Sequence, residues 1–432
     1  MLNRYRNTMK RYKLGHLIEV TRGASLSGNY YATSGKYIRL TCGHFDYRNN
    51  CFKENTSKDN LYYTGEFRAD FLLEKGDLIT PLTEQAIGLL GSTAWIPESE
   101  KYIQSQDIAK IRCNEELLDK QFAYYLISSN IVKQQLSAAA QQTKIRHTSP
   151  DKIKDCTVWL PSLAEQKHIG SILANLDRKI ALNRSINHNL EAMAKQLYDY
   201  WFVQFDFPDE NGKPYKSSGG KMVWNEKLKR EIPEGWFGEN ICRIANILSG
   251  GTPSKKEAAY WNNGIIPFFA PTDYSGNIFQ ISTEDHITDK GLEHCASSLF
   301  ETGVIIITAR GSIGKLVVVG TPMAMNQSCY AIQSKKDEFE YLYFLTLQLI
   351  ESLRTKGNGS VFKSIIVSDI ENSWLCIGCD EVVNAFSKKV KPIFECIKEN
   401  TLEIAAFTKL RDSLLPLLMN GQVSVNYDLS ND

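Results

Sequence analysis

The chain has 432 residues, more than the roughly 250 that one hydrophobic core usually serves, so we expect at least two domains. Hydrophobic residues make up 43% of the sequence, as in an ordinary globular protein, and no apolar run approaches the roughly 18 residues that cross a bilayer. The basic start leads into no apolar leader segment, so we expect a cytoplasmic protein with no membrane partner. The net charge of +1 excludes a global basic signature, so any nucleic-acid-binding charge must be local.

The first predicted region, Tyr12 to Leu160, is mixed: short β-branched and aromatic runs alternate with Gly, Asn, Ser and Thr turns, and a helical segment lies near Leu117 to Gln135. This pattern is typical of a compact α+β domain. One set of loop residues combines basic, polar and aromatic side chains: Arg22, Ser25, Asn29, Tyr30, Tyr31, Lys36 and Arg39. Such a set can contact phosphates and base edges together, although ordinary solvated loops have the same composition.

Two long stretches, Leu163 to Phe202 and Glu381 to Leu418, carry apolar residues three or four positions apart, which predicts two long helices. An offset of 217 takes Ile169 to Phe386 and continues in register along both stretches. The chain is therefore an internal repeat. Each helix would be about 60 Å long and needs a partner for its apolar seam, so we expect the two copies to form an antiparallel or crossed coiled-coil spacer.

Two details of these helices carry further expectations. Asn183 maps onto Asn400 and both fall on the seam, where they either pair with each other and fix the register or remain exposed. Pro392 lies inside the second stretch, so that helix either bends there or begins only after it.

A polar connector, Asp206 to Arg230, has the composition of a linker. Beyond it, a second mixed region covers Phe237 to Cys379. The repeat extends into this region, because Gly76 to Thr80 resembles Gly303 to Thr308, a turn that enters a buried strand. Three further correspondences join the segments 117–135 and 340–354, Ile145 and Phe362, and Ile153 and Ile370.

Catalytic motifs are not apparent. The sequence has no Asn-Pro-Pro-aromatic methyltransferase tetrad. The stretch Gly311 to Leu316 has the wrong spacing for a phosphate-binding loop, and we interpret it as a turn between two strands, the second continuing through Val319. Cys376 and Cys379 form the only close cysteine pair, too few ligands for a zinc site. We therefore expect no catalytic residue, no metal and no cofactor on this chain.

Whole phrases of the sequence resemble those of type I restriction-modification specificity subunits. In the first half these are LPSLAEQKHI (160–169) and ILANLDRKI (172–180); in the second they are IPEGW (232–236), SGGTPS (249–254), YW (260–261), IPF (266–268), ARGSIG (309–314) and NQS (326–328). The first half departs from the pattern: Pro81 to Glu84 stands where the second half has Ala309 to Ser312, and Gln104 to Asp107 stands near the position of Asn326 to Ser328. Residue roles should therefore not be copied from one half to the other.

The resemblance implies an α+β fold with two pseudo-repeated mixed α/β target recognition domains, separated by two long helices that form an antiparallel coiled-coil spacer. Pattern and resemblance together divide the chain into residues 1–160 (first recognition domain), 161–203 (central conserved helix), 204–236 (linker), 237–379 (second recognition domain), 380–420 (distal conserved helix) and 421–432 (polar tail).

In function, the resemblance implies a non-catalytic subunit whose domains each read one half of a bipartite site in double-stranded DNA. Two modification subunits would dock on the helices, and motor-nuclease restriction subunits could join. S-adenosylmethionine, ATP and magnesium would be bound by those partners. Exposed aromatic residues near the end of the first helix would suit this docking, or else would pack against the adjacent domain: Tyr198, Tyr200, Trp201 and Phe202.

A few Arg, Lys, Ser and Thr side chains in each domain are expected to contact DNA. The candidates are Arg22, Arg39, Lys144 and Arg146 in the first domain, and Thr252, Arg310, Ser312 and Lys363 in the second. Arg310 has an alternative role, bracing its own turn. For the whole chain the alternatives are a stand-alone sequence-specific DNA-binding regulator and a protein-interaction scaffold, and loss of affinity with salt would argue against the scaffold.

Overall fold

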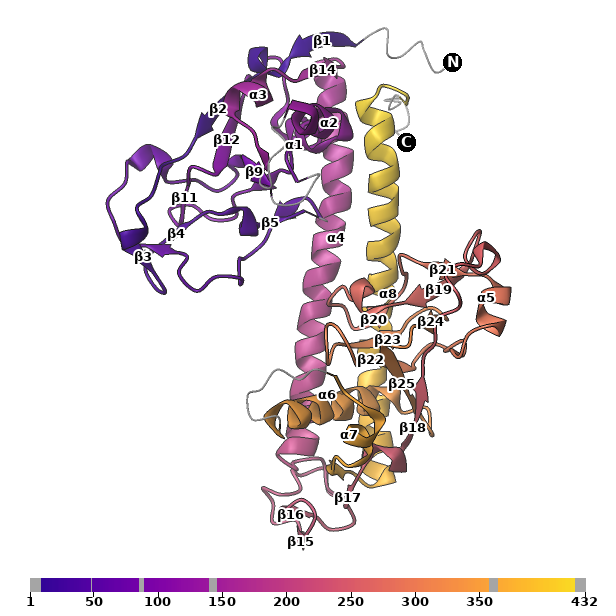
Figure 1. The fold of residues 1–432 in the computed structure, drawn as a ribbon. Helices are drawn as coiled ribbons and strands as arrows, with labels where there is room; N and C mark the ends of the chain where they lie inside the picture. The colour runs from indigo at the N-terminus through magenta and orange to yellow at the C-terminus, as the bar shows by residue number, and fades with distance from the viewer. Residues whose placement is uncertain (1–8, 48, 85–88, 140–145, 357–363, 424–432) are drawn as a thin grey trace, which may run out of the picture. The chain divides into compact units, whose positions relative to one another are not determined.

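The computed structural model describes residues 9–47, 49–84, 89–139, 146–356 and 364–423. The chain forms two compact units, which we describe separately: unit 1 comprises residues 1–179 and 407–432, and unit 2 comprises residues 180–406. Each unit contains one mixed domain and one segment of each long helix (Figure 1). Among the described residues, no helix combines the length and apolar character needed to cross a bilayer.

Unit 1 is built on a four-stranded antiparallel sheet with the order β10-β8-β12-β2, whose inner face is covered by α1 and α2. A second sheet has the order β11-β4-β7-β3, and β1 pairs with β14. The strands are β1 (Lys10–Lys13), β2 (Ile18–Arg22), β3 (Tyr31–Ala32), β4 (Tyr37–Arg39), β5 (Phe45–Asp46), β6 (Cys51–Phe52), β7 (Tyr62–Tyr63), β8 (Leu78–Pro81), β9 (Thr83–Glu84), β10 (Ala94–Trp95), β11 (Tyr102–Ile103), β12 (Ile108–Cys113), β13 (Arg146–His147) and β14 (Thr157–Leu160). The short helices are α1 (Lys120–Ser128), α2 (Asn130–Ala139) and α3 (Pro150–Lys154).

Unit 2 is built on a five-stranded sheet with the order β18-β25-β22-β23-β20, and α6 packs against it. Smaller sheets are β21-β19-β24, β15-β16 and β17-β26. The strands are β15 (Met222–Asn225), β16 (Arg230–Pro233), β17 (Phe237–Glu239), β18 (Ala245–Ser249), β19 (Ile266–Phe269), β20 (Phe279–Gln280), β21 (His286–Ile287), β22 (Ile305–Thr308), β23 (Leu316–Val319), β24 (Ala324–Met325), β25 (Cys329–Ser334) and β26 (Leu375–Ile377). The helices of the domain are α5 (Asp289–Glu293), α6 (Phe339–Lys356) and α7 (Val367–Glu371).

The two long helices are α4 (Leu163–Tyr198, followed by a π-helical turn at Asp199–Val203) and α8 (Asp380–Met419). A capping box starts α4: the Ser162 amide donates to the Glu165 carboxylate at 3.0 Å, and the Glu165 amide donates to the Ser162 hydroxyl at 3.4 Å. Pro392 lies on an exposed position inside a continuous α8. The expectation that this helix begins only after Pro392 is therefore wrong.

Within each unit the helix segments pack antiparallel. In unit 1, Asp177 contacts Arg411. In unit 2, the Asn183 amide donates to the Glu403 carboxylate at 2.8 Å, and the Asn400 amide donates to the Asn187 side chain at 2.9 Å. Asn183 and Asn400 thus lie on the seam but do not pair with each other: Asn183 bonds to Glu403, and Asn400 bonds to Asn187.

The predicted linker is folded. Strands β15 and β16 form a hairpin in register from Met222 opposite Pro233, and Phe207 stacks on Trp236 with ring centroids 5.1 Å apart. Phe205 and Phe207 are buried in the core of unit 2. The polar composition of this segment obscured the aromatic residues that anchor it.

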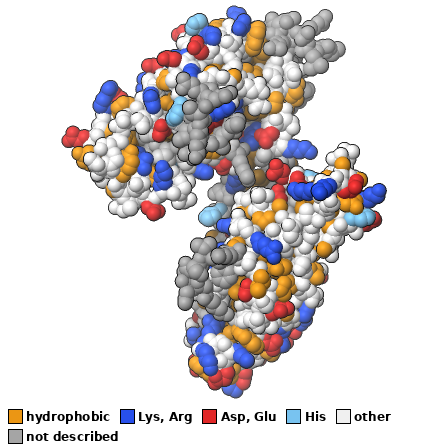
Figure 2. Space-filling model, viewed as in Figure 1, with side chains coloured by type: hydrophobic (Ala, Val, Ile, Leu, Met, Phe, Trp, Pro, Cys, Tyr) orange, Lys and Arg blue, Asp and Glu red, His pale blue; other side chains and the backbone are white. Residues whose placement is uncertain are grey.

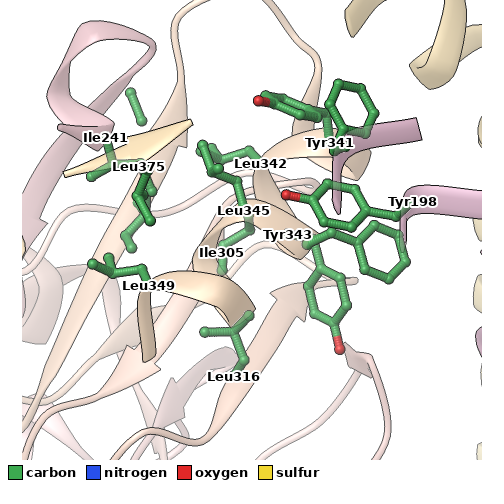
Figure 3. Packing of buried hydrophobic residues seen from close by; sticks show 14 of the residues in the cluster. Tyr198, Ile241, Ile305, Leu316, Tyr341, Leu342, Tyr343, Leu345, Leu349 and Leu375 are labelled. Carbon is green, nitrogen blue, oxygen red and sulfur yellow. The ribbon is translucent and has the colours of Figure 1, made fainter. Parts of the chain in front are cut away.

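The aromatic residues at the end of α4 belong to the same core. Tyr198, Trp201 and Phe202 are at most 5% exposed, and Figure 3 shows Tyr198 packed beside Tyr341 of α6. Only Tyr200 of the predicted docking set is exposed, at 37%. Packing against the adjacent domain, the alternative to docking, is therefore correct for the other three.

Candidate nucleic-acid interface

In unit 2 the candidate residues come from loops at one edge of the large sheet. Thr308, the last residue of β22, lies opposite Cys329, the first residue of β25, and Ser249 at the end of β18 lies opposite Tyr330. The loops that follow β18 and β22 and the loop that precedes β25 therefore meet at this edge. They carry Thr252, Arg310 and Ser312, which the sequence had singled out.

Backbone hydrogen bonds and close contacts connect these loops to one another. The Gly250 amide donates to the Cys329 carbonyl at 3.4 Å, and a Cβ at Gly250 would collide with the Asn326 carbonyl, so only glycine permits this approach. The Ala309 and Arg310 amides both donate to the Ser328 carbonyl, at 2.8 and 3.2 Å. The edge is thus a fixed frame for side chains.

The side chains on this frame differ in their exposure and in their hydrogen-bond partners. Arg310 is exposed, and among the described residues no partner for its guanidinium is found. Ser312 is also exposed; its carbonyl accepts the Thr308 hydroxyl, which closes the turn between β22 and β23 predicted from the sequence. The Thr252 hydroxyl donates to the side-chain carbonyl of Gln327. Lys363 lies outside the described residues.

Unit 1 has a corresponding edge. The Gly23 amide donates to the Ile108 carbonyl at 3.3 Å, and the Leu82 amide donates to the Asp107 carbonyl at 2.8 Å. A Cβ at Gly23 would collide with the carbonyls of Gln104 and Ser105. This is the arrangement of unit 2, built from a different sequence.

The matching hydrogen bonds define which residues are equivalent. The Thr148 amide donates to the Leu82 carbonyl, and the Ile365 amide donates to the Ala309 carbonyl in the same way. The equivalent residues are therefore Gly23 and Gly250, Leu82 and Ala309, Asp107 and Ser328, Ile108 and Cys329, and Thr148 and Ile365. The repeat offset therefore falls from 227 near the start of each domain to 221 and then 217, the value seen in the helices. The structure also shifts the sequence correspondence by one residue, because Leu82 rather than Pro81 matches Ala309.

The predicted residues of the first domain divide into two groups. Arg22 is exposed at the sheet edge and its Nε donates to the Gln106 carbonyl at 2.8 Å. Arg146 lies on β13, donates to the Ser137 hydroxyl at 2.8 Å and is 3.6 Å from the buried Glu84 carboxylate. Both are at the edge, although Arg146 is partly engaged by the protein.

Arg39 belongs to the interior. It is only 8% exposed, donates to the Asn60 carbonyl at 3.2 Å and lies 3.8 Å from the ring centroid of Tyr31. In this conformation its guanidinium stabilises the β11-β4-β7-β3 sheet region and is not available to a DNA base. Lys144 lies outside the described residues.

Local rather than global charge characterises this surface. On the face seen in Figure 2, Lys and Arg side chains are interspersed with Asp and Glu. Positive charge at the edges includes Arg22 and Arg310, which are exposed, and Arg146, which is partly neutralised by Glu84.

Sequence reasoning missed two residues at these edges, Gln106 and Gln327, both exposed. Each stands two positions before a central strand, β12 or β25. The sequence had placed Gln104 to Asp107 near the position of Asn326 to Ser328 without assigning either glutamine a role. The matched hydrogen bonds of Asp107 and Ser328 fix the offset at 221 and pair Gln106 with Gln327.

Comparison with known families matches residues 7–192 and 233–375 to the type I restriction modification DNA specificity domain. The chain is 26% identical over 310 residues to the specificity subunit of the type I restriction enzyme MjaIX of Methanocaldococcus jannaschii, covering 71% of this chain and 69% of that protein. It is 23% identical over 378 residues to the HindI specificity subunit of Haemophilus influenzae, covering 75% and 82%. Its fold is similar to the crystal structure of a type I restriction-modification S subunit from M. genitalium, with a TM-score of 0.59, 15% identity and coverage of 95% and 96%.

Proposed function

This chain belongs to the family of type I restriction-modification specificity subunits, and we propose that its two mixed domains are target recognition domains that each read one half of a bipartite DNA site. The observation that carries the proposal is the repeated sheet edge: the same frame of glycine contacts and backbone hydrogen bonds presents exposed polar and basic side chains in both domains. A protein with two repeated recognition domains suits a DNA site in two parts, because each domain can contact its own half-site.

We further propose that the chain is not catalytic and acts through partners. Two modification subunits would dock on the long helices and supply S-adenosylmethionine chemistry on adenine, and motor-nuclease restriction subunits would bring ATP and magnesium. The helices offer apolar surface for docking: Leu182 and Met193 of α4 are 58% and 57% exposed, and Leu402 and Leu410 of α8 are 42% and 46% exposed. These exposed apolar positions are the candidates for contact with a protein partner.

Mapping of methylated adenines by single-molecule sequencing tests the DNA-reading proposal. Cells carrying the cognate modification subunit are compared with and without this gene. We expect a split motif that appears only with the gene, and we expect one half of it to change when residues 237–379 are exchanged for the corresponding domain of a relative. Absence of gene-dependent methylation, despite a purified complex, would favour a regulator or scaffold.

Copurification with the modification subunit tests the docking proposal. Met193→Glu places a charge on the exposed apolar surface of α4 and should reduce recovery of the modification subunit. His188→Glu is the matched control, because it adds the same charge at an exposed polar position of the same helix, about 140° around the helix axis from Met193. Equal recovery with both variants would exclude this surface as the docking site.

A further inference from the structure

Two glutamines occupy equivalent positions on the repeated sheet edges. Gln106 and Gln327 are each followed by the residue whose carbonyl accepts the cross-loop hydrogen bond, Asp107 in the first domain and Ser328 in the second. Both are exposed, and both stand two positions before the central strand of their sheet. The frame therefore holds the same residue type at the same place in both domains, although the surrounding sequences diverge.

Glycine contacts fix the backbone just before each glutamine. A Cβ at Gly23 would collide with the carbonyl of Ser105, and a Cβ at Gly250 would collide with the carbonyl of Asn326. Ser105 and Asn326 are the residues that immediately precede the glutamines. Since the backbone on either side is held by a close contact and a hydrogen bond, little backbone entropy remains to be lost when the side chain meets a ligand.

Each glutamine is also braced from the segment at or just after the neighbouring edge strand, but by different chemistry. In the first domain the Arg22 guanidinium donates to the backbone carbonyl of Gln106. In the second the Thr252 hydroxyl donates to the side-chain carbonyl of Gln327. The first brace leaves the whole side-chain amide of Gln106 free. The second turns the carbonyl oxygen of Gln327 toward Thr252, using one of its two lone pairs, and leaves its NH₂ group free.

The neighbouring Gln104 shows what a structural glutamine looks like in this fold. It is 1% exposed, and its Nε2 donates to the carbonyls of Thr21 at 2.8 Å and Ile108 at 3.0 Å. Within the described part of the chain, the side-chain amide of Gln106 has no such partner and that of Gln327 has only Thr252. Neither exposed glutamine is needed to satisfy the fold.

We propose that Gln106 and Gln327 are the matched base-contacting residues of the two half-sites, and that Thr252 is the positioning residue of Gln327. The inference rests on the proposed function. Gln106 offers a donor and an acceptor side by side, which is the pattern that adenine N7 and N6 complement in the major groove. Gln327, with its carbonyl oxygen turned toward Thr252, presents its NH₂ donor, which suits guanine O6 or N7 or thymine O4.

The test uses the full chain in its complex with the modification subunit. Gln106→Ala and Gln327→Ala are each assayed against DNA duplexes that carry single base-pair changes in the methylated motif. Gln106→Ala should lose discrimination about 5- to 150-fold at one base position, as expected when a good bidentate contact is removed. Gln327→Ala should lose about fivefold at one position of the other half-site, as expected for a single donor contact. Gln134→Ala and Gln333→Ala are the controls, since both remove exposed glutamines, on α2 and on β25.

The outcomes separate this inference from the proposed function. If the unaltered protein directs methylation to no split motif, the proposed function fails. If it does read a split motif but both variants keep full discrimination at every position, the glutamine assignment is overturned and the proposed function stands. Relaxation of both halves by either single variant would also overturn the assignment, because each glutamine would then act on the complex as a whole.

Discussion

In the first recognition domain the Lys110 ammonium and the Asp77 carboxylate form an ion pair of 2.6 Å, with side chains only 11% and 16% exposed. The equivalent positions of the second domain, by the matched hydrogen bonds, are Ala331 and Val304, both buried and apolar. The backbone frame is the same in both. The same backbone frame therefore accepts either a paired charge or two apolar side chains at these positions.

The helix segments repeat this contrast. In unit 1 the Asp177 carboxylate accepts from Arg411 at 2.8 Å and from the Tyr125 hydroxyl at 2.6 Å. The offset of 217 places Phe394 and Ala194 at the equivalent positions in unit 2, and both are completely buried. In the first half, removal of one partner of a buried pair is therefore strongly destabilising. In the second half, a substitution that leaves a cavity in the packed core is strongly destabilising.

Removal of the Phe394 side chain should have the largest effect. Phe394 lies between 5.7 and 6.3 Å, centroid to centroid, from the rings of Phe339, Tyr343, Phe344 and Phe279. Phe394→Ala leaves a cavity in this cluster and should cost about 4 kcal/mol of unfolding free energy in unit 2. Amide hydrogen exchange of the full chain should show faster exchange in β22 and β25 and unchanged exchange in β8 and β12. Equal acceleration in both domains would contradict the separate cores.

The second-largest expected effect is a pH dependence of stability that distinguishes unit 2 from unit 1. Burial raises the pKa of Glu340, at the start of α6, to about 7; Glu395 and Glu338 add to the shift and Lys391 opposes it. The buried residues of α1, the corresponding helix of unit 1, include no carboxylate. Because the folded state holds the proton more tightly than the unfolded state, stability of unit 2 should fall as pH rises from 4.5 to 7, by about 3 kcal/mol.

Glu340→Gln should remove this pH dependence, leaving the variant more stable than the unaltered chain at pH 7.5 and nearly equal to it at pH 4.5. Urea-dependent pulse proteolysis of the full chain at the two pH values measures the difference, with fragments from unit 1 as an internal reference. A constant difference between variant and unaltered chain at both values would mean that Glu340 does not titrate in this range.

The ion pair of the first domain gives a smaller effect that can be reversed. Lys110→Ala leaves Asp77 without its cation in a nearly closed site and should cost about 2 kcal/mol. The double variant Asp77→Val with Lys110→Ala recreates the chemistry of the second domain and should recover most of that loss. Amide hydrogen exchange of β8 and β12 measures the stability of the single and of the double variant. A double variant as unstable as the single one would show that the two domains are not interchangeable at this position.

Much of the architecture could be predicted because it depends on periodicity. The 217 offset, the two long helices and the turn after Thr308 follow from spaced apolar residues and glycines, and the structure confirms them. What the sequence could not predict depends on contacts between distant segments. The burial of Arg39 comes from Tyr31 and Asn60, and the partners of Asn183 and Asn400 follow from the antiparallel register. A basic residue in a loop has the same sequence signature whether it faces DNA or the core.

The smallest expected effect concerns the one brace that differs in kind between the two edges. Thr252→Val keeps the shape of the side chain but removes the hydroxyl that donates to Gln327, so the acceptor of Gln327 becomes free, as that of Gln106 already is. Discrimination in the second half-site should change about fivefold, the equivalent of about 1 kcal/mol, and should shift toward adenine. In the Gln327→Ala background the same substitution should have no further effect, because its only route to DNA has been removed. Additive effects in this double-mutant cycle would show that Thr252 contacts DNA itself, as the sequence alone had indicated.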